Sequence, residues 1–272
     1  MNPRHNQLLA ALPYDEWTRW LPHLELVTLA RDQVLFESGD APSSVLFPTT
    51  AVVSLSYLTR EGASAEFAVV GSDGVVGISL IMGGITTPSR AFAQSAGRGY
   101  RMDAQVVRAA VQSGGAMQSL LLRYTQSLIV QTAQVAVCNR HHSIDQQLSR
   151  RLLVALDRAQ IEQFAMTHEA VAKLLGVRRE GVTAAAQKLQ RGGAISYRRG
   201  QIAVLDRRLL EAQACECYAV VKREQQRLLP LRPQVRSVMP QTMPQTMPQS
   251  CQAAFSQSTT CPAAPASPWA TS

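Results

Sequence analysis

Residues 167–190 read THEAVAKLLGVRREGVTAAAQKLQ, a pattern typical of two short helices separated by a glycine turn. Thr167 is a natural N-cap for the first helix, and Gly176 ends it where a residue with positive φ is favoured. The apolar stripe of the first helix comprises Ala170, Val171, Leu174 and Leu175, and that of the second comprises Val182, Ala185, Ala186 and Leu189. Two such helices form a helix-turn-helix, whose second helix can enter the major groove of DNA.

A β-hairpin is predicted directly after these helices. Residues 194–197 and 201–205 read as two strands, and Arg198-Arg199-Gly200 joins them. The helical pattern alone also fits an αα-corner in any globular protein. A hairpin with arginines at its tip favours DNA binding, because such a wing can contact phosphates.

The positive charge of the chain is concentrated in the same region. The net charge of the 272 residues is +8, yet residues 1–142 carry ten basic and ten acidic side chains. Residues 143–229 carry fifteen basic and nine acidic side chains, and eight of the basic ones fall within 178–208. This asymmetry suits a neutral module joined to one that meets a polyanion, although a solvated basic face is the alternative.

The N-terminal region has a different pattern. A short helix is predicted over residues 8–22. From Leu24 to about Met102, short β-rich runs at 45–47, 51–55 and 67–70 alternate with turn signals at 38–40, 60–62, 71–74 and 83–84. Strands at this spacing, without helical crossovers between them, predict an antiparallel barrel or sandwich.

A long helix follows Gly114-Gly115. Apolar positions alternate at spacings of four and three, which is the pattern of a coiled-coil seam and predicts a dimer. The predicted dimer seam comprises Met117, Leu121, Tyr124, Leu128, Gln131 and Val135. A second stripe, formed by Leu122, Ile129, Ala133 and Val137, lies beside it, so the helix can pack on its own domain and on a partner together. The alternative is a long core helix in a monomer.

The chain is predicted to end in a segment without regular structure. A further helix is expected over residues 143–158. Residues 230–272 are rich in Pro, Gln and Ser, and the prolines of their Met-Pro-Gln repeat forbid helix and sheet ladder alike. The predicted domains are a sensor domain (1–113), a dimerisation helix (114–142), a DNA-binding domain (143–229) and a disordered tail (230–272).

The C-terminal third resembles the Crp/Fnr family of transcription regulators. The residues that carry the resemblance are Thr167, Glu169, Gly176, Arg179, Glu180, Val182, Leu189-Gln190 and the wing from Ser196 to Ile202. Gly39-Asp40 and Gly74-x-x-Gly77 resemble the turn glycines of the family's β-roll. The resemblance implies an α+β fold with three parts: an N-terminal antiparallel β-roll of the jelly-roll type, a long dimerisation helix and a C-terminal winged helix-turn-helix.

The resemblance also implies roles for residues of the second helix. Arg179 matches the family arginine that reads guanine, and Glu180 matches the glutamate that accepts a hydrogen bond from cytosine. The usual third reader, an arginine, is Ala184 here, with Thr183 before it as a further candidate. A surface ion pair with Glu180 or Asp206 is the alternative for Arg179. The expected phosphate contacts are Thr167, Arg178, Lys188, Arg198 and Arg199.

The sensor region departs from the cyclic-AMP-binding members of the family. Those members place a glutamate after the glycine that matches Gly77 and an arginine farther along, whereas this chain has Ile78 and Ser89, with Arg90 one place later. The loss of a ribose-binding carboxylate leaves polar groups of the ligand unpaired. We expect Gly77, Ile78, Ser89 and Arg90 to mark the effector pocket, if one exists, but not to bind cyclic AMP.

No cofactor or metal is predicted. The iron–sulfur members of the family use N-terminal cysteines, whereas the first cysteine here is Cys138. Adjacent residues on a helix point about 100° apart, so His141 and His142 do not share a metal easily. Cys215 and Cys217 are separated by one residue and lack a second pair, so their spacing does not indicate zinc. Core or surface cysteines are the favoured interpretation, with a thiol switch as the alternative.

These patterns predict a dimeric transcription regulator that binds double-stranded DNA. The resemblance to the Crp/Fnr family implies that the homodimer binds a pseudo-palindromic site and meets RNA polymerase. The competing hypothesis is a β-roll module that acts through protein partners. No nucleophile–base constellation or phosphate-binding loop indicates an enzyme. No uncharged apolar run of 18 residues predicts a membrane span, and the run at residues 8–12 is too short for a signal peptide, so a cytoplasmic location is expected.

Overall fold

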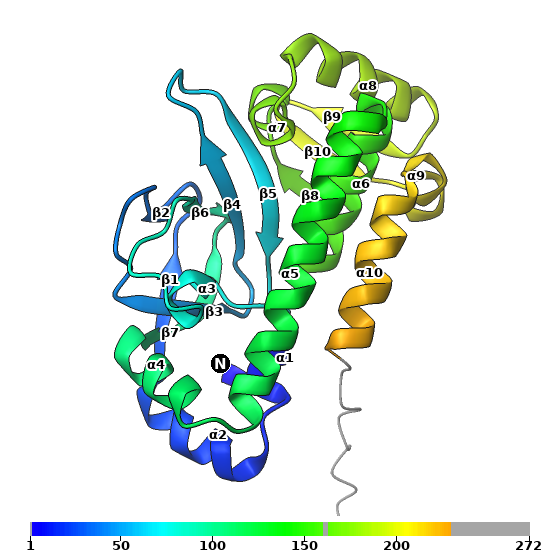
Figure 1. Cartoon of the computed structure of the whole chain (residues 1–272). Helices are drawn as coiled ribbons and strands as arrows, with labels where there is room; N and C mark the ends of the chain where they lie inside the picture. The colour runs from blue at the N-terminus through cyan, green and yellow to red at the C-terminus, as the bar shows by residue number, and fades with distance from the viewer. Residues whose placement is uncertain (1, 160–162, 230–272) are drawn as a thin grey trace, which may run out of the picture. The chain divides into compact units, whose positions relative to one another are not determined.

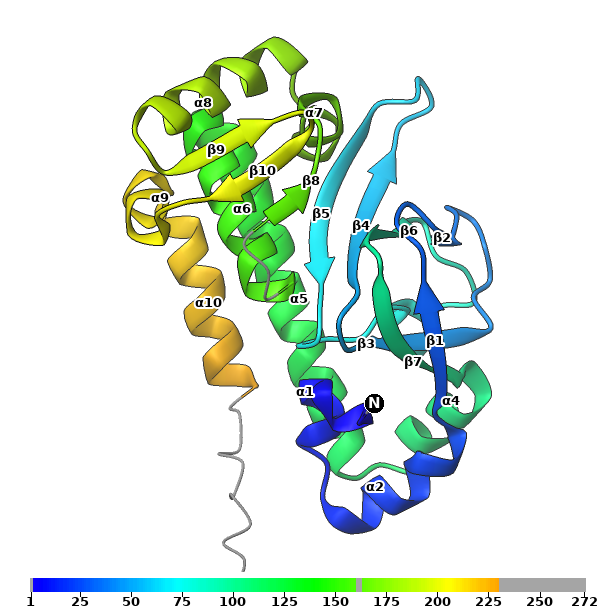
Figure 2. The same cartoon turned by 180° about the vertical axis from the view of Figure 1, so that it is seen from behind.

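Two antiparallel sheets occupy the N-terminal half of the computed structural model, which describes residues 2–159 and 163–229 (Figures 1 and 2). The strands are β1 (Glu25–Leu29), β2 (Val34–Phe36), β3 (Ser44–Pro48), β4 (Val52–Leu58), β5 (Ser64–Val70), β6 (Arg90–Ser95) and β7 (Gly97–Asp103). One sheet has the order β1-β7-β3 and the other the order β2-β6-β4-β5. The predicted antiparallel architecture is confirmed. The predicted runs 45–47 and 67–70 fall within β3 and β5, and the run 51–55 begins one residue before β4.

Two positions of the predicted turn motif require glycine, each for a different structural reason. Gly77 has φ +98° at the start of the short helix α3 (Ile78–Ile81), a conformation that favours glycine. At Gly74, a Cβ atom would lie 2.5 Å from the hydroxyl oxygen of Tyr124. Tyr124 is 5% exposed, so its ring cannot move aside without opening the core.

The predicted N-terminal helix over 8–22 is interrupted. The chain forms a 3₁₀ turn, η1 (Pro3–His5), then α1 (Gln7–Ala10), α2 (Tyr14–Trp20) and a second 3₁₀ turn, η2 (Leu21–His23). Pro13 stands at the N-cap of α2 with φ −57° and ψ 153°. Proline has no backbone N–H and clashes with the preceding turn, so a continuous helix through Pro13 is disfavoured. The apolar spacing alone did not reveal this break.

The long helix is α5 (Ala116–His141), which follows α4 (Ala104–Gln112), and it carries the residues of the predicted dimer seam. The expected seam faces the chain's own sheets rather than a partner. Of its members, Met117, Leu121, Tyr124, Gln131 and Val135 are buried, and the half-buried Leu128 packs on the apolar core of the sheets. These residues pack within the chain, and their part in a dimer stays a prediction.

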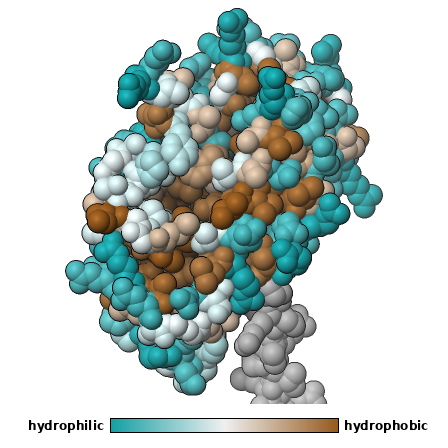
Figure 3. Space-filling view, in the orientation of Figure 1, coloured by the Kyte–Doolittle hydropathy of each residue, from teal (hydrophilic) through white to brown (hydrophobic). Residues whose placement is uncertain are grey.

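The second stripe of α5 is the exposed one. Leu122 is 61% exposed, Ile129 54% and Val137 45%, and Ala133 lies beside them. Apolar side chains gather on the molecular surface where α5 crosses it (Figure 3). Leu122 and Ile129 are seven residues apart, so they share one face of the helix. The sequence pattern contained both stripes, and the structure buries the first and exposes the second.

The C-terminal half consists of helices around a small sheet. Its elements are α6 (Ile144–Ala159), β8 (Gln163–Ala165), α7 (His168–Leu175), α8 (Arg179–Arg191), β9 (Ile195–Arg198), β10 (Gln201–Val204), α9 (Arg207–Gln213) and α10 (Glu216–Leu228). The strands pair antiparallel in the order β8-β10-β9. The predicted wing is therefore completed by a third strand, and α9 and α10 are further elements that the sequence patterns did not indicate.

One apolar core joins the two halves. Val52 of β4 and Val69 of β5 belong to the same buried cluster as Leu152 of α6 and Leu174 of α7. The strand β5 also meets the turn after α7, where the Cβ of Ala65 lies 3.5 Å from the position that a Cβ on Gly176 would take. The β4–β5 hairpin therefore packs directly against the helix-turn-helix.

A buried ion pair crosses the same boundary. Glu66 of β5 lies 2.5 Å from Arg151 of α6, measured between Oε1 and Nε, and Arg151 Nη2 donates to Glu66 Oε2 at 3.0 Å. The carboxylate also accepts from Ser54 at 2.5 Å, and the guanidinium donates to Gln94 at 2.7 Å. Both charged side chains are at most 6% exposed. Hydrogen bonds thus accompany the charge pair, as burial of two charges requires.

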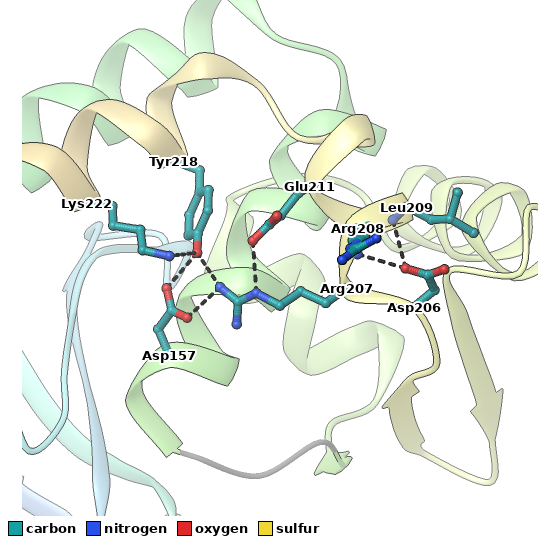
Figure 4. Close-up of polar contacts among 8 residues, drawn as sticks. All are labelled: Asp157, Asp206, Arg207, Arg208, Leu209, Glu211, Tyr218 and Lys222. Atoms are coloured by element: carbon teal, nitrogen blue, oxygen red, sulfur yellow. Dashed lines mark hydrogen bonds and ion pairs between the residues drawn. The ribbon is translucent and has the colours of Figure 1, made fainter.

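The last helix, α10, is held by a polar network (Figure 4). The hydroxyl of Tyr218 donates to Asp157 of α6 at 2.7 Å and accepts from Arg207 of α9 at 2.6 Å and from Lys222 at 3.2 Å. Arg207 also donates to Asp157 at 2.8 Å. Burial and the neighbouring Asp157 raise the pKa of Tyr218, so the hydroxyl remains a donor. The views of Figures 1 and 2 agree in placing α10 alongside α5.

No helix among residues 2–159 and 163–229 is long and apolar enough to cross a membrane. These residues pack as one unit, so the predicted domain boundaries at 113 and 142 mark changes of secondary structure and stay predictions. The predicted disordered tail, 230–272, lies outside the described residues.

We expect Arg151→Met to lower the free energy of unfolding by about 3–5 kcal/mol, because the substitution leaves the charge of Glu66 buried without a partner. Urea unfolding followed by circular dichroism measures this loss. The matched control is Arg101→Met, which removes an exposed pair with Glu25 at 2.7 Å and should cost less than about 1 kcal/mol. Equal losses in the two variants would contradict the role given to the buried pair.

Candidate nucleic-acid interface

The helices α7 and α8 form the predicted helix-turn-helix with the expected caps. Thr167 Oγ1 accepts from the backbone N–H of Ala170 at 3.1 Å, and Gly176 ends α7 with φ +68°. The predicted stripe of α8 is fully internal: Val182, Ala185, Ala186 and Leu189 are each at most 2% exposed. The inner faces of both helices are therefore used for packing, and their outer faces are left for contact with other molecules.

His168 connects the three parts of this surface, a role that the sequence analysis did not assign. Its ring stacks on Tyr197 of the wing, with centroids 4.0 Å apart and planes at 20°. Its Nδ1 lies 3.0 Å from the hydroxyl oxygen of Thr183 on α8. The Thr183 hydroxyl donates to the carbonyl oxygen of Arg179 at 3.0 Å, so Nδ1 of His168 is the donor to Thr183.

The environment of His168 favours the neutral ring. Its Nε2 is buried without a hydrogen-bond partner among the described residues. Desolvation, and then the positive charge of Arg179, lower the pKa of His168. A neutral ring with its proton on Nδ1 satisfies this geometry, whereas a proton on Nε2 would have no acceptor.

The outward face of α8 begins with two exposed charged residues. Arg179 and Glu180 stand in the first turn, directly after the N-cap Arg178, and all three are exposed. At 100° per residue, Glu180 shares its face with Ala184, Gln187 and Arg191, which are also exposed. Gln187 and Arg191 are thus further candidates for DNA contact that helical periodicity alone could have identified.

Two predicted contact residues are already engaged within the chain. Thr183, expected to read a base, is half-buried and directs its hydroxyl toward α7 and the backbone of Arg179. Lys188, expected at a phosphate, forms an ion pair with Asp145 of α6. Thr183 and Lys188 lie on the two flanks of α8, facing α7 and α6 respectively. Their positions favour a role in fixing α8 over direct contact with DNA.

The wing ends in a tight turn that exposes its arginines. Arg198 pairs with Gln201, and the two residues between them, Arg199 and Gly200, have φ values of +47° and +76°. Positive φ at both central positions defines the type I′ turn, which matches the twist of a two-residue hairpin. Arg198 and Arg199 are exposed at the tip, as expected for phosphate contacts.

The four residues expected to mark an effector pocket lie near the start of α3 and of β6. Ser89 is buried, and its hydroxyl lies 3.0 Å from that of Thr87. Arg90 forms an ion pair with Glu37 at 3.2 Å and lies over the ring of Phe92. Gly77 and Ile78 shape the turn into α3. The charge of Arg90 is thus already countered, and an effector pocket here stays a prediction.

A family model for the Crp-like helix-turn-helix domain matches residues 146–213. The match spans α6 through α9 and includes the wing. No curated protein matches the sequence of this chain.

Solved structures share the fold at low sequence identity. A regulator of the Crp/Fnr family from Eubacterium rectale is 17% identical and has a TM-score of 0.62, with 77% of this chain and 98% of that chain covered. FixK2 from Bradyrhizobium japonicum is 16% identical, with a TM-score of 0.60 and coverage of 71% and 98%. The c-di-GMP responsive regulator CLP from Xanthomonas campestris is 16% identical, with a TM-score of 0.59 and coverage of 71% and 100%.

The domain match and the fold agree with each other. Residues 146–213 form a Crp-like helix-turn-helix domain, and the chain has the fold of a solved regulator of the Crp/Fnr family. The neighbours from Eubacterium rectale and Xanthomonas campestris are described as regulators.

We expect the stability of the chain to fall as the pH drops through the titration of His168. Because folding lowers the pKa of His168, the unfolded chain binds the proton more readily. The stability that the neutral ring contributes is complete above the unfolded value of about 6.5 and is lost as the pH falls below it. Melting temperatures at about pH 7.5 and about pH 5.5 should therefore differ more for the native chain than for His168→Gln.

The exposed His23 provides the matched control, because His23→Gln should keep the pH dependence of the native chain. An unchanged pH dependence in His168→Gln would contradict the role assigned to this ring.

Proposed function

We propose that this protein is a transcription regulator of the Crp/Fnr type that binds a pseudo-palindromic site in double-stranded DNA as a homodimer, with α8 in the major groove. The observation that carries the proposal is the pair Arg179 and Glu180, both exposed in the first turn of a recognition helix whose opposite face is fully buried. Residues at this end of a recognition helix contact base edges in the helix-turn-helix docking geometry. The basic region 178–208 supplies the long-range attraction to the polyanion.

The two side chains suit complementary bases. A guanidinium donates two hydrogen bonds to O6 and N7 of guanine, and a carboxylate accepts from N4 of cytosine. Arg179 and Glu180 thus have the chemistry to read the bases of a G·C pair or of neighbouring pairs. The exposed Gln187 and Arg191 extend the readable surface along α8, past Ala184.

Phosphate contacts would surround this base-reading surface. Arg178 lies at the N-cap of α8, and Arg198 and Arg199 lie at the wing tip. Thr167 caps the N-terminus of α7, where the free N–H groups of the first turn and a hydroxyl proton favour a phosphate oxygen. Lys188 is a phosphate contact only if its pair with Asp145 opens.

The exposed stripe of α5 is the proposed dimer interface. Leu122, Ile129 and Val137 occupy one side of a 26-residue helix, and exposed apolar side chains in a continuous stripe favour pairing with a second copy. A two-fold axis along paired α5 helices would present two α8 helices to half-sites about one helical turn of DNA apart. This symmetry requires a pseudo-palindromic site.

The remaining parts of the proposal follow from DNA binding. A regulator bound next to a promoter would meet RNA polymerase, and its action would be cytoplasmic. An effector other than cyclic AMP would act through the sheets, which share an apolar core with the helix-turn-helix. The competing hypothesis, a module that acts through protein partners, predicts no salt-sensitive binding to duplex DNA.

We expect Arg179→Ala to weaken binding to the selected site by about 1–3 kcal/mol and to relax the base preference at one position of each half-site. Arg198→Ala should instead weaken all sequences alike and reduce the salt slope by about one. Binding curves at several salt concentrations, on the site recovered by genome-wide footprinting and on a scrambled duplex, measure both effects. The control is Arg98→Ala, which removes an equal charge from an exposed position on β7. Identical profiles for Arg179→Ala and Arg198→Ala would overturn these assignments.

We expect Ile129→Glu to convert the dimer into monomers, because a carboxylate in a paired apolar stripe would be desolvated. Sedimentation equilibrium measures the mass. Ile85→Glu is the matched control, since Ile85 is 77% exposed and lies away from α5, in the loop after α3. A native chain that sediments as a monomer, or a dimer that survives Ile129→Glu, would exclude this interface.

A further inference from the structure

Four residues with metal-binding side chains meet where α5 ends and α10 begins. Cys138 and His142 come from the end of α5, one helical turn apart, and Cys215 and Cys217 come from the start of α10. Their potential ligand atoms all lie within 4.8 Å of one another. The spacing of Cys215 and Cys217 did not indicate zinc, but α5 supplies the second pair of ligands that the sequence analysis found missing.

The spacing of these atoms matches the edges of a small tetrahedron. Zinc binds sulfur at about 2.3 Å and nitrogen at about 2.0–2.1 Å, so neighbouring ligands of a tetrahedral site lie about 3.5–3.8 Å apart. Cys138 Sγ lies 3.5 Å from Cys215 Sγ, and Cys217 Sγ lies 3.6 Å from His142 Nδ1. Such separations fit a single ion. In a four-iron cluster, by contrast, each cysteine sulfur binds a different iron atom, so the sulfurs lie farther apart.

The burial of the cluster indicates a closed, structural site. Cys138 and Cys217 are 0% exposed and Cys215 is 5% exposed, and the side chain of His142 is 14% exposed. The three cysteines form a buried cluster of their own, apart from the three apolar cores. They are free thiols, and they are all the cysteines of the described residues. Four protein ligands without an open position are typical of structural zinc.

The surroundings of the cluster orient and balance its ligands. His142 Nε2 lies 3.2 Å from Glu216 Oε1, which leaves Nδ1 for the metal, and this carboxylate–histidine pairing is usual behind a zinc ligand. Gln147 donates to the carbonyl oxygen of His142 at 2.9 Å and so fixes the end of α5. The buried Arg150 places a positive charge near Cys138. Zinc with three thiolates carries a net charge of −1, which Arg150 offsets.

We propose that Cys138, His142, Cys215 and Cys217 bind one zinc ion, which fixes α10 to the end of α5. Binding releases the three thiol protons to solvent, because thiolates are the ligands. A disulfide between Cys138 and Cys215 is the competing use of the same atoms. A disulfide would use only two of the four residues and would not explain why Cys217 and His142 lie beside them.

The position of the ion gives it a structural consequence. The link between α5 and α6 is short, with α5 ending at His141 and α6 beginning at Ile144. On its other side, α10 is bound to α6 and α9 through Tyr218 (Figure 4). Zinc would therefore connect the helix of the proposed dimer interface with the DNA-binding domain at the hinge between them.

The test uses the full-length chain purified under reducing conditions, with zinc measured by mass spectrometry of the elements. We expect about one zinc per chain in the native protein and less than about a tenth of that in Cys215→Ser and in His142→Ala. Replacement of zinc by cobalt should give the visible absorption bands of a tetrahedral, thiolate-bound ion in the native chain alone. Cys251→Ser, which removes a cysteine outside the described residues, should keep the full zinc content.

A milder variant separates a lost ligand from a lost fold. Glu216 is 71% exposed, so Glu216→Gln should fold normally, keep the cobalt spectrum and bind zinc about 10–100-fold more weakly in competition with a chelator. Circular dichroism confirms the fold of each variant. Three results would overturn the proposal: no zinc uptake by the reduced native chain, full zinc retention in both ligand variants, or a Cys138–Cys215 disulfide in place of metal. None of these measurements depends on DNA binding.

Discussion

The buried ion pair between Glu66 and Arg151 is the contact on which the arrangement of the two halves depends. Each charge is nearly inaccessible to water, so either one alone would be strongly unfavourable, and β5 and α6 must meet in one register. Val52 and Val69 continue the core of α6 and α7 beside this pair. The helix α6 also packs on α8, so continuous contacts connect the sheets with α8. The helix-turn-helix is therefore packed against the sheets and is not a separate unit.

The helix-turn-helix could be predicted from the sequence because its determinants are local. The cap at Thr167, the positive φ of Gly176 and the buried stripe from Val182 to Leu189 act within a few residues of one another. The strands of the wing could be predicted for the same reason, since two arginines and a glycine separate two short β-rich runs. The break at Pro13 also has a local cause. The proline itself indicates the break, whereas the apolar spacing fits one continuous helix.

The features that could not be predicted depend on contacts between distant parts of the chain. Both stripes of α5 are apolar, and only the position of the sheets decides that Leu121 is internal and Leu122 exposed. Thr183 and Lys188 have the right residue types for DNA, but their partners, His168 and Asp145, come from other helices. The four residues of the proposed zinc site form two pairs, one on α5 and one on α10, and the two pairs are about 75 positions apart in the sequence. The local signal was the spacing of Cys138 and His142 on a helix.

The turn at the tip of the wing reveals a trade-off between folding and recognition. Arg199 adopts φ +47°, a conformation that costs an ordinary residue on the order of 1 kcal/mol and that asparagine or glycine tolerates better. Selection for stability alone would replace this arginine. Its guanidinium makes no contact that offsets this strain within the described chain. In the proposed complex, a contact between Arg199 and a DNA phosphate would offset it, so DNA binding would stabilise the wing.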